Sequence, residues 1–485
     1  MLIKDKPDTI KNYFEDSSNM KGGRAEKVVL PESAEEAAIV LKEANSKKIP
    51  VTVSGGGTGT TGSRIPFGGI VISTERLNSI SGVSAEKMSA VVQAGVLVED
   101  LKNACEKDGL FYTSHPTEKT AFVGGTVSTN ASGARSFKYG PTRKYVRRLK
   151  MALTNGYIAD IRRGERVLTR LNSRINLGGF GIDVPLPAYK MPDVKNSAGY
   201  FAKDGMDLID LFIGQEGTLS VITEIEMALV KKPPEILSSF LFFKREEDAW
   251  GFSEEVRKRA FDVLSVEYLD SNALRLLSIK NPNVPARMKA AIFFEEDTHG
   301  RKADASIEKW LKTISRHNAS LDDSWVAMNE TEADKFTKFR HDIPEAVNDI
   351  IRRTGFQKLS TDIAVPDDKF PEMMKFYVDR LKNSGLEHVI FGHIGESHLH
   401  VNILPRSEDE LAEGRKIALG FVKKGVSLGG TVSAEHGIGK IKHPYLEAMY
   451  GKQGIMEMAL LKKAFDPNCI LGLDNIFPRE ILDSI

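Results

Sequence analysis

The sequence predicts an α+β protein with more than one domain, and three observations support this prediction. The chain has 485 residues, which is enough for two or three domains of ordinary size. Short β-branched runs alternate with amphipathic stretches of helical period along most of its length. The pair Pro233–Pro234 separates a half rich in glycine stretches from a half with alternating strand and helix patterns.

The half before the proline pair begins with a strand and a helix. Ser33 and Glu36 have the spacing of a capping box, which predicts a helix that runs to about Lys47. A second helix should end near Gly109. The insert 161–192 carries Arg, Gly and Pro, so we expect it to be irregular. Strands are expected at 28–30, 49–53, 69–73, 90–94, 145–160 and 219–229.

The half after the proline pair predicts a second α+β domain. A further helix is expected in the final segment, 451–485. Strand and helix patterns alternate over 237–243, 245–260, 263–269, 290–295, 303–317, 321–328, 330–353, 359–365, 370–384, 387–393, 398–404 and 409–427.

Composition narrows the classes of function. Hydrophobic residues make up 41% and charged residues 27% of the chain, as in an ordinary globular enzyme. A net charge of +1 argues against a nucleic acid or an acidic membrane surface as a partner. The first residues do not resemble a signal peptide, and no run of about 18 apolar residues occurs. We therefore expect no transmembrane segment and a cytoplasmic protein, alone or held at a membrane by a partner.

Cys105 and Cys469 are the only cysteines. Two thiols cannot build a disulfide framework, and they are too few to ligate an iron–sulfur cluster. We interpret them as buried thiols in a reducing compartment.

A glycine loop at 54–62 follows the strand expected at 49–53. Its residues 57–62 match the pattern G-x-G-x-x-G, but the dinucleotide-binding interpretation needs a helix directly afterwards. Here Pro66 and the pair Gly68–Gly69 follow, and then a strand, so that interpretation fails. Small residues in succession still expose backbone N–H groups that can bind a pyrophosphate. The alternative is a flexible surface turn.

Two more stretches of small residues occur in the same half, at 124–133 and at 196–200 together with 214–219. Each stretch alone is weak. Three of them in one half suggest that one long polar ligand passes through it.

The second half contains a cluster of histidines beside glycines. His393, His398 and His400 lie within 391–402, and His436 follows Glu435 within 431–439. Imidazole and carboxylate are common ligands of zinc and other first-row metals. The alternative is a set of structural histidines whose ring nitrogens are satisfied inside the fold.

The three glycine stretches, taken in order, resemble the FAD domain of the vanillyl-alcohol oxidase superfamily. With the histidine cluster added, the set resembles the D-2-hydroxy-acid dehydrogenase branch, which includes D-lactate and D-2-hydroxyglutarate dehydrogenases and the glycolate oxidase flavin subunit. The resemblance extends over about 25–478. It implies an FAD-binding domain of two subdomains (PCMH type) at 1–232 and a substrate or cap domain at 233–450, with an antiparallel sheet flanked by helices. The segment 451–485 would return to the FAD domain.

The resemblance also implies the residues that hold FAD. The loop carries no His, and relatives that link FAD covalently do so through a His there, so we expect non-covalent FAD. The implied residues are Gly55, Gly56, Gly57, Thr58, Gly59, Pro116, Thr117, Gly124, Thr129, Asn130, Ser132, Gly133, Glu216 and Ile222.

By the same resemblance, a divalent metal, expected to be Zn²⁺, is held by His393, His400 and Glu435. The metal leaves coordination positions for substrate and acidifies its hydroxyl. Three further roles are implied: His436 as the base, Arg340 as the partner of the substrate carboxylate, and Lys358 and Asn402 as polar contacts. Arg340 has an alternative as a solvated helix residue.

The chain departs from the family pattern at 395–398, where relatives often read Gly-Asp-Gly-Asn and this chain reads Gly-Glu-Ser-His. We expect the extra His398 to lie on the face opposite His400 and to be either a structural residue or an outer partner of the metal ligands. The departure leaves the identity of the substrate open.

The implied function is FAD- and metal-dependent oxidation of a D-2-hydroxy acid, such as lactate, glycolate or 2-hydroxyglutarate, to the 2-oxo acid by hydride transfer to flavin N5. Electrons would leave to an electron-transfer protein, an iron–sulfur subunit, a quinone or O₂, and a homodimer is compatible with the sequence. Two alternatives stay open. One is a non-haem iron oxygenase, which also uses two His and a carboxylate but leaves the glycine stretches unexplained. The other is a non-catalytic flavin electron-transfer subunit.

Overall fold

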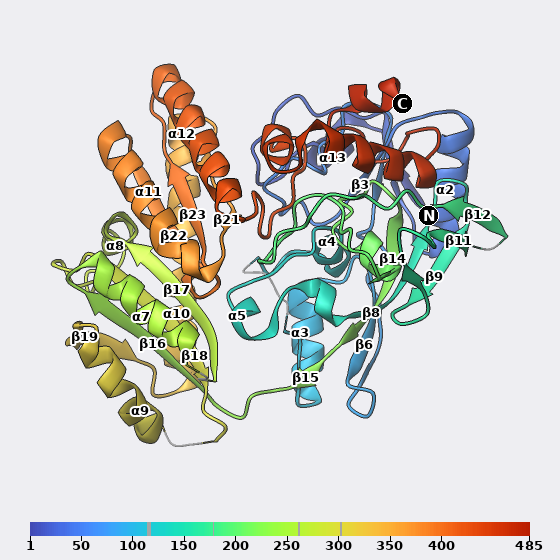
Figure 1. Cartoon of the computed structure of the whole chain (residues 1–485). Helices are drawn as coiled ribbons and strands as arrows, with labels where there is room; N and C mark the ends of the chain where they lie inside the picture. The colour runs from blue at the N-terminus through green and yellow to red at the C-terminus, as the bar shows by residue number, and fades with distance from the viewer. Residues whose placement is uncertain (114–117, 178, 260–261, 301–302) are drawn as a thin grey trace.

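The computed structural model describes residues 1–113, 118–177, 179–259, 262–300 and 303–485 of the chain. Figure 1 shows two halves side by side. The N-terminal residues, in blue to green, form one half, and the yellow to orange residues form the other. The C-terminal helix, in red, lies over the first half rather than the second. The predicted α+β class is confirmed.

A four-stranded sheet carries the glycine loop. Its order is β1 (Leu2–Lys4), β2 (Lys27–Leu30), β4 (Ile70–Ser73) and β3 (Val51–Ser54). The strands β2, β4 and β3 are parallel, and β1 is antiparallel to β2. Helix α2 (Ala34–Ser46) packs its alanines and Leu41 on this sheet. The Ser33 side chain accepts a hydrogen bond from the Glu36 N–H at 3.2 Å, as the capping motif predicts.

The second sheet of this half is antiparallel and has β14 (Val221–Ala228) at its centre. Its order is β5 (Ile80–Ser84), β6 (Ser89–Gln93), β14, β8 (Val146–Ala152) and β9 (Ile158–Arg162). The predicted strand 145–160 is therefore two strands. Helices α1 (Pro7–Ile10), α3 (Val98–Lys107), α4 (Val123–Ser128), α5 (Ser136–Tyr139) and α6 (Ile209–Phe212) complete this part.

The insert is more regular than we expected. It contains the hairpin of β11 (Arg174–Leu177) and β12 (Phe180–Asp183), and β10 (Val167–Leu168) pairs with β13 (Met206–Asp207). Gly179, with a φ of +90°, lies in the turn of the hairpin, where a glycine adopts this backbone conformation without strain. Gly179, one of the residues that suggested irregular structure, thus serves a turn.

The cap half is built on one antiparallel sheet, as predicted. Strands β17 and β18 are buried along their whole length because helices cover both faces. The sheet contains β19 (Ala319–Val326), β16 (Ile236–Phe243), β18 (Ala290–Asp297), β17 (Val263–Asp270), β22 (His388–Gly392), β23 (His398–Ile403) and β20 (Leu359–Ser360) in that order, and β21 (Ile363–Ala364) also pairs with β23. The helices are α7 (Glu246–Lys258), α8 (Ser271–Ser278), α9 (Ala303–Arg316), α10 (Glu330–Thr354), α11 (Phe370–Ser384) and α12 (Glu408–Ser427).

The last helix, α13 (His443–Phe465), begins before the predicted tail and bends at Gly451, whose φ is +66°. After it, the Val51 N–H donates to the Ile470 carbonyl at 2.7 Å, and Leu471 bridges to Val51. The C-terminal segment therefore extends the sheet that carries the glycine loop. Among the described residues, no helix is both long and apolar enough to cross a membrane.

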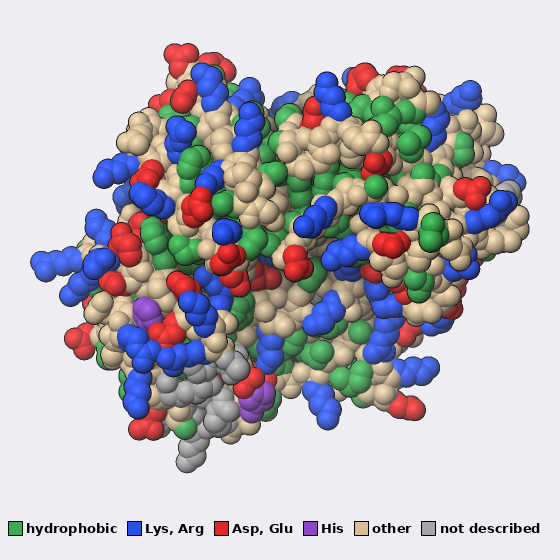
Figure 2. All heavy atoms as spheres, in the orientation of Figure 1, with side chains coloured by type: hydrophobic (Ala, Val, Ile, Leu, Met, Phe, Trp, Pro, Cys, Tyr) green, Lys and Arg blue, Asp and Glu red, His purple; other side chains and the backbone are tan. Residues whose placement is uncertain are grey.

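Ion pairs join the two halves. Arg135, beside α5, donates from Nε and Nη2 to the Glu295 carboxylate at 2.9 and 2.8 Å, and Lys138 lies 3.5 Å from Asp297. Strand β15 (Val230–Lys231), just before the proline pair, joins β7 (Leu110–Phe111). Figure 2 shows basic and acidic side chains interspersed over the visible face, in keeping with the net charge of +1.

Candidate functional site

The turn between β22 and β23 brings two of the predicted metal ligands together. His400 pairs with Phe391 across the two strands, and His393 directly follows β22. A Cβ at Gly392 would lie 3.0 Å from Cδ2 of the His400 ring, so only glycine leaves room for that ring. A Cβ at Gly395 would lie 2.7 Å from the ring of Phe137, which belongs to the N-terminal half. The turn therefore packs closely against that half.

Four side chains form a buried cluster. Ring nitrogens of His393, His398 and His400 and a carboxylate oxygen of Glu435 all lie within 4.8 Å of one another. His393 Nε2 is 3.1 Å from Glu435 Oε1, and His400 Nε2 is 3.8 Å from Glu435 Oε2. Three imidazoles and a carboxylate are the donor set of a first-row divalent metal, so these residues fit the implied ion.

The expectation for His398 is wrong. Residues two apart in a strand share a face, so His398 and His400 of β23 point to the same side. Their ring centroids are 4.6 Å apart, and the His398 ring is 5.3 Å from that of His393. The extra histidine therefore belongs to the cluster.

Outer partners orient the predicted ligands. His393 Nδ1 is 2.5 Å from Glu267 Oε1, and His400 Nδ1 is 3.2 Å from the Thr361 carbonyl. Glu267 also accepts from Arg340 Nε at 3.1 Å and Nη2 at 2.7 Å. Burial would raise the pKa of Glu267, but Arg340 and His393 outweigh it and lower this pKa to about 2. Arg340 is thus buried at the site and is not a solvated helix residue.

The charges of the cluster are strongly coupled. Burial lowers the pKa of His393, but Glu267 and Glu435 outweigh this and raise it to about 9. Burial opposes ionisation of Glu435 as well, yet His393 and Lys195 hold its pKa well below the ordinary value. The carboxylate is therefore ionised and available to a cation.

Lys195 is a site residue that the sequence analysis missed. It belongs to the N-terminal half, and its Nζ lies 2.5 Å from Glu435 Oε1, 2.8 Å from Glu396 Oε2 and 2.9 Å from Ser136 Oγ. Only 4% of the side chain is exposed. Its position directly before the small-residue stretch 196–200 was the one signal in the sequence that it lies close to a ligand.

His436, the predicted base, lies beside the cluster. Its ring stacks on His400 at 5.1 Å, and its Nδ1 is 3.3 Å from Asp362 Oδ2. Burial lowers the pKa of His436 to about 4, so the imidazole is neutral near pH 7. Asp362 also accepts from Ser433 Oγ at 2.7 Å and from Lys442 Nζ at 2.9 Å, and it fixes this segment.

Asn402 and Lys358, the two residues expected to provide polar contacts to the substrate, differ in burial. Asn402 is fully buried on the same strand as His400, and its Oδ1 has no hydrogen-bond partner in the part of the chain that the structure describes. Lys358 is half-buried, and its Nζ reaches Asn348 Oδ1 at 3.4 Å. Burial lowers the pKa of Lys358 to about 8.

The predicted FAD stretches lie against one another. A Cβ at Gly55 would be 3.9 Å from Cα of Gly125, so the glycine loop faces the start of α4. Among the described residues, a Cβ at Gly59 or Gly125 would meet no atom within 4 Å, so these residues leave open space beside the loop. Ser132 Oγ is buried and has no hydrogen-bond partner within the described ranges. An open cradle with a polar atom to satisfy fits the phosphate-bearing cofactor.

The remaining predicted FAD residues serve the local structure as well. Gly124 packs on Ala94, where a Cβ would come within 2.6 Å of the Ala94 Cβ. Thr129 and Asn130 end α4, and Asn130 Oδ1 accepts from the Arg143 N–H at 2.9 Å. Ile222 is buried on β14. Pro116 and Thr117 lie outside the described residues.

Hydrogen bonds connect these stretches to the segment 433–439, which contributes Glu435 to the histidine cluster. Glu216 accepts from the N–H groups of Ile438 and Gly439, both at 2.7 Å, and from Ser63 Oγ at 2.8 Å. The Ser197 hydroxyl lies 3.2 Å from the Asn130 carbonyl and 3.1 Å from the Ala434 carbonyl. The segment 433–439, which carries Glu435 and His436, is therefore held on the predicted FAD site.

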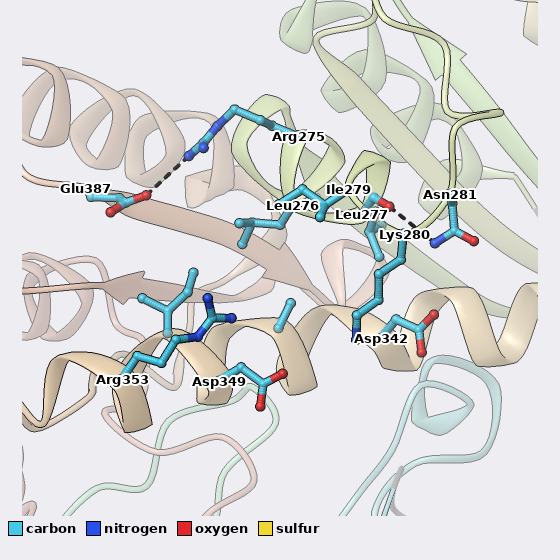
Figure 3. Close-up of a pocket in the computed structure, with 12 residues that line it drawn as sticks. Arg275, Leu276, Leu277, Ile279, Lys280, Asn281, Asp342, Asp349, Arg353 and Glu387 are labelled. Carbon is cyan, nitrogen blue, oxygen red and sulfur yellow. Dashed lines mark hydrogen bonds and ion pairs between the residues drawn. The ribbon is translucent and has the colours of Figure 1, made fainter.

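A separate pocket of about 220 Å³ lies between α8 and α10 on the cap. Figure 3 shows Arg275, Lys280 and Arg353 around it together with Asp342, Asp349 and Glu387. Its lining contains none of the cluster residues, and its mixed charges favour no ligand class.

Comparison with known proteins gives two family matches that together cover most of the chain. Residues 25–162 match the FAD binding domain, and residues 232–473 match FAD linked oxidases, C-terminal domain. D-lactate dehydrogenase of Archaeoglobus fulgidus is 32% identical over 92% of this chain and 90% of its own length. Glycolate oxidase subunit GlcD of Bacillus subtilis is 28% identical over 96% and 92%. D-2-hydroxyglutarate dehydrogenase of Xanthomonas citri is 26% identical over 98% and 94%.

Two solved structures share the fold. A 4-ethylphenol oxidase of Gulosibacter chungangensis has a TM-score of 0.71 at 15% identity and covers 99% of this chain and 95% of its own. An alkyldihydroxyacetonephosphate synthase has a TM-score of 0.67 at 17% identity and covers 98% and 83%. At these identities the likeness shows the fold alone.

Proposed function

The chain belongs to the family of FAD-linked oxidases, and we propose that it oxidises a D-2-hydroxy acid to the 2-oxo acid by hydride transfer to FAD. One observation carries the proposal: the segment with Glu435 and His436 is hydrogen-bonded to Ser197 and Glu216, and the Ser197 hydroxyl also lies 3.2 Å from the carbonyl of Asn130 in the predicted FAD site. A metal-binding cluster and a flavin site that are both lined by the segment 433–439 would hold a small alcohol between them, in position for oxidation.

The names of the relatives support the substrate class. They refer to D-lactate, glycolate and D-2-hydroxyglutarate, which share a hydroxyl group beside a carboxylate. Membership of the FAD-linked oxidases also accounts for the glycine stretches, which the interpretation as a non-haem iron oxygenase leaves unexplained.

When bound, FAD would supply the hydride acceptor, and a divalent cation, which we propose to be Zn²⁺, would supply a Lewis acid. His393, His400 and Glu435 would hold that cation. His436 would take the hydroxyl proton, because its Nδ1 faces Asp362 and its Nε2 is left to accept. The low pKa of His436 keeps this nitrogen unprotonated near pH 7.

We propose three substrate contacts. Arg340 would bind the substrate carboxylate. Its guanidinium donates to Glu267, and Glu267 also contacts His393, so Arg340 lies close to the proposed metal ligands. Lys358 and Asn402 would provide polar contacts, and the unpaired Asn402 Oδ1 is suited to accept from a hydroxyl group.

We also propose which domain binds the cofactor and which binds the substrate. Residues 1–232 and 451–485 would hold FAD without a covalent link, and 233–450 would hold substrate and metal. The bend of α13 at Gly451 lies at the second of these limits. An electron acceptor outside the chain would reoxidise the flavin.

The test is anaerobic mixing of the flavin-loaded protein with a panel of D- and L-2-hydroxy acids. We expect one D-acid to bleach the oxidised flavin absorbance and its L-enantiomer to leave it unchanged. Prior removal of metal with a chelator should prevent bleaching while FAD stays bound. If no acid of either hand bleaches the flavin, the proposed reaction is wrong.

A further inference from the structure

We propose that His398 is a fourth protein ligand of the metal ion, through Nδ1, so that this site offers three imidazoles and one carboxylate. The proposal rests on the metal site of the proposed function and adds a residue that the resemblance does not assign. In the sequence pattern, His398 stands where relatives often carry Asn.

The first argument concerns the proton on each ring. A neutral imidazole carries one N–H, and the acceptor that binds this N–H fixes which nitrogen keeps a lone pair. Glu267 and the Thr361 carbonyl take the Nδ1 side of His393 and His400. Nε2 of each ring therefore faces Glu435 and is the nitrogen left for a metal ion, which on binding would replace the proton between His393 Nε2 and Glu435.

His398 is held in the same way with the two nitrogens exchanged. Its Nε2 is 2.9 Å from Asp362 Oδ1, so the ring proton lies there and Nδ1 keeps the lone pair. Asp362 is itself fixed by Lys442, by Ser433 and by the His436 N–H at 2.9 Å. Carboxylate–histidine–metal arrangements in proteins are built in this way.

The second argument is the free nitrogen. The His398 side chain is 0% exposed, and Nδ1 is buried with no hydrogen-bond partner among the residues that the structure describes. A buried acceptor without a donor is costly to keep unless something satisfies it. A structural histidine needs only the Asp362 contact, which leaves the buried Nδ1 without a function, whereas a metal ion at the cluster would satisfy it.

The third argument is distance. Metal–nitrogen bonds of about 2.0–2.1 Å place two ligands of a tetrahedral ion about 3.3 Å apart. The pairs His393–Glu435 and His400–Glu435 are at 3.1 and 3.8 Å, and all four groups lie within 4.8 Å. One ion among them would contact all four groups once the widest separations close by up to about 1.5 Å.

A fourth protein ligand changes what the metal can do. A tetrahedral ion with four protein ligands has no vacant position, so a substrate oxygen must raise the coordination number to five or six. We therefore expect tight metal binding and a coordination number that rises when substrate enters.

The first experiment needs no variant. The purified protein is loaded with Co²⁺, and X-ray absorption counts the imidazoles bound to the metal. We expect three imidazoles. A count of two overturns the proposal and leaves the metal site of the proposed function intact.

The second experiment compares His398→Asn with the control His388→Asn. His388 is a half-buried histidine of β22 whose Nδ1 lies 2.9 Å from the Leu386 carbonyl. Competition with a chromophoric chelator gives the Zn²⁺ affinity, and flavin content reports the fold. Since loss of an outer partner alone costs about 10–100-fold, we expect His398→Asn to weaken binding by at least about 100-fold and the control to match wild type.

The outcomes separate the two proposals. Equal Zn²⁺ affinity in His398→Asn and His388→Asn, with His393→Ala unable to bind, overturns only the role of His398. A wild-type protein that binds no Zn²⁺ or Co²⁺ overturns the metal site and the fourth ligand together. If His398→Asn loses its flavin, the imidazole count of the wild-type protein decides.

Discussion

Lys195 should contribute more to stability than any other lysine at the junction of the two halves. It is one buried cation shared by two carboxylates, the buried Glu435 at 2.5 Å and the half-buried Glu396 at 2.8 Å. Lys195→Met keeps the length of the side chain and removes the charge, so that Glu396 keeps its hydrogen bond from Ser136 but loses its cation. Removing one partner of a buried ion pair lowers the free energy of unfolding by about 3–5 kcal/mol, and we expect Lys195→Met to lower it by this amount in the metal-free protein.

The assay is urea unfolding of the metal-free protein. With an m value of about 3 kcal/mol per M, the expected loss lowers the midpoint by about 1–1.7 M. The matched control is Lys138→Met, since Lys138 joins the same two halves through Asp297 at 3.5 Å but keeps 27% of its side chain exposed. A pair of that kind is worth about 0–1 kcal/mol. If the two variants unfold at the same urea concentration, the shared ion pairs of Lys195 do not stabilise the junction.

Three further predictions concern the site. His436→Ala should slow flavin reduction by about 10²–10⁴-fold in stopped flow with metal and FAD contents unchanged, and a wild-type rate would assign the proton to another group. Arg340→Ala should weaken Zn²⁺ binding by about 10–100-fold, because Glu267 then loses the cation that holds it on His393; unchanged affinity would show that Glu267 needs no such support. Acid precipitation should release all FAD into the supernatant, and flavin absorbance that stays with the pellet would show a covalent link.

Local sequence signals were sufficient to predict most of the helices and strands. The capping serine of α2 acts within four residues, and the strands of the cap carry β-branched and aromatic runs, so their limits could be placed within a few residues. Helix α8 was missed, although Asp270 caps it through the Ala273 N–H at 2.7 Å. It has only eight residues and follows β17 without a break, so no change of period marks its start.

The candidate site was predictable only where its residues lie in one motif. His393, directly after β22, and His400 of the paired strand β23 are seven residues apart, and the turn between them shows in the sequence. Lys195, Glu267 and Asp362 come from distant segments and reach the cluster only because the sheet and the docking of the two halves place them there. A buried carboxylate in a strand such as β17 carries no local sign of its partner.

The distant residues decide how the cluster can act. A histidine is a ligand only through a nitrogen that keeps its lone pair, and Glu267, Thr361 and Asp362 determine which nitrogen that is in each ring. Lys195, from the other half, lies on the carboxylate that completes the set. The donor set is therefore assembled by both halves together, since the cap alone would lack the cation beside Glu435 and the backbone contacts that hold its segment. Metal affinity should then report on the docking of the halves as well as on the ligands themselves.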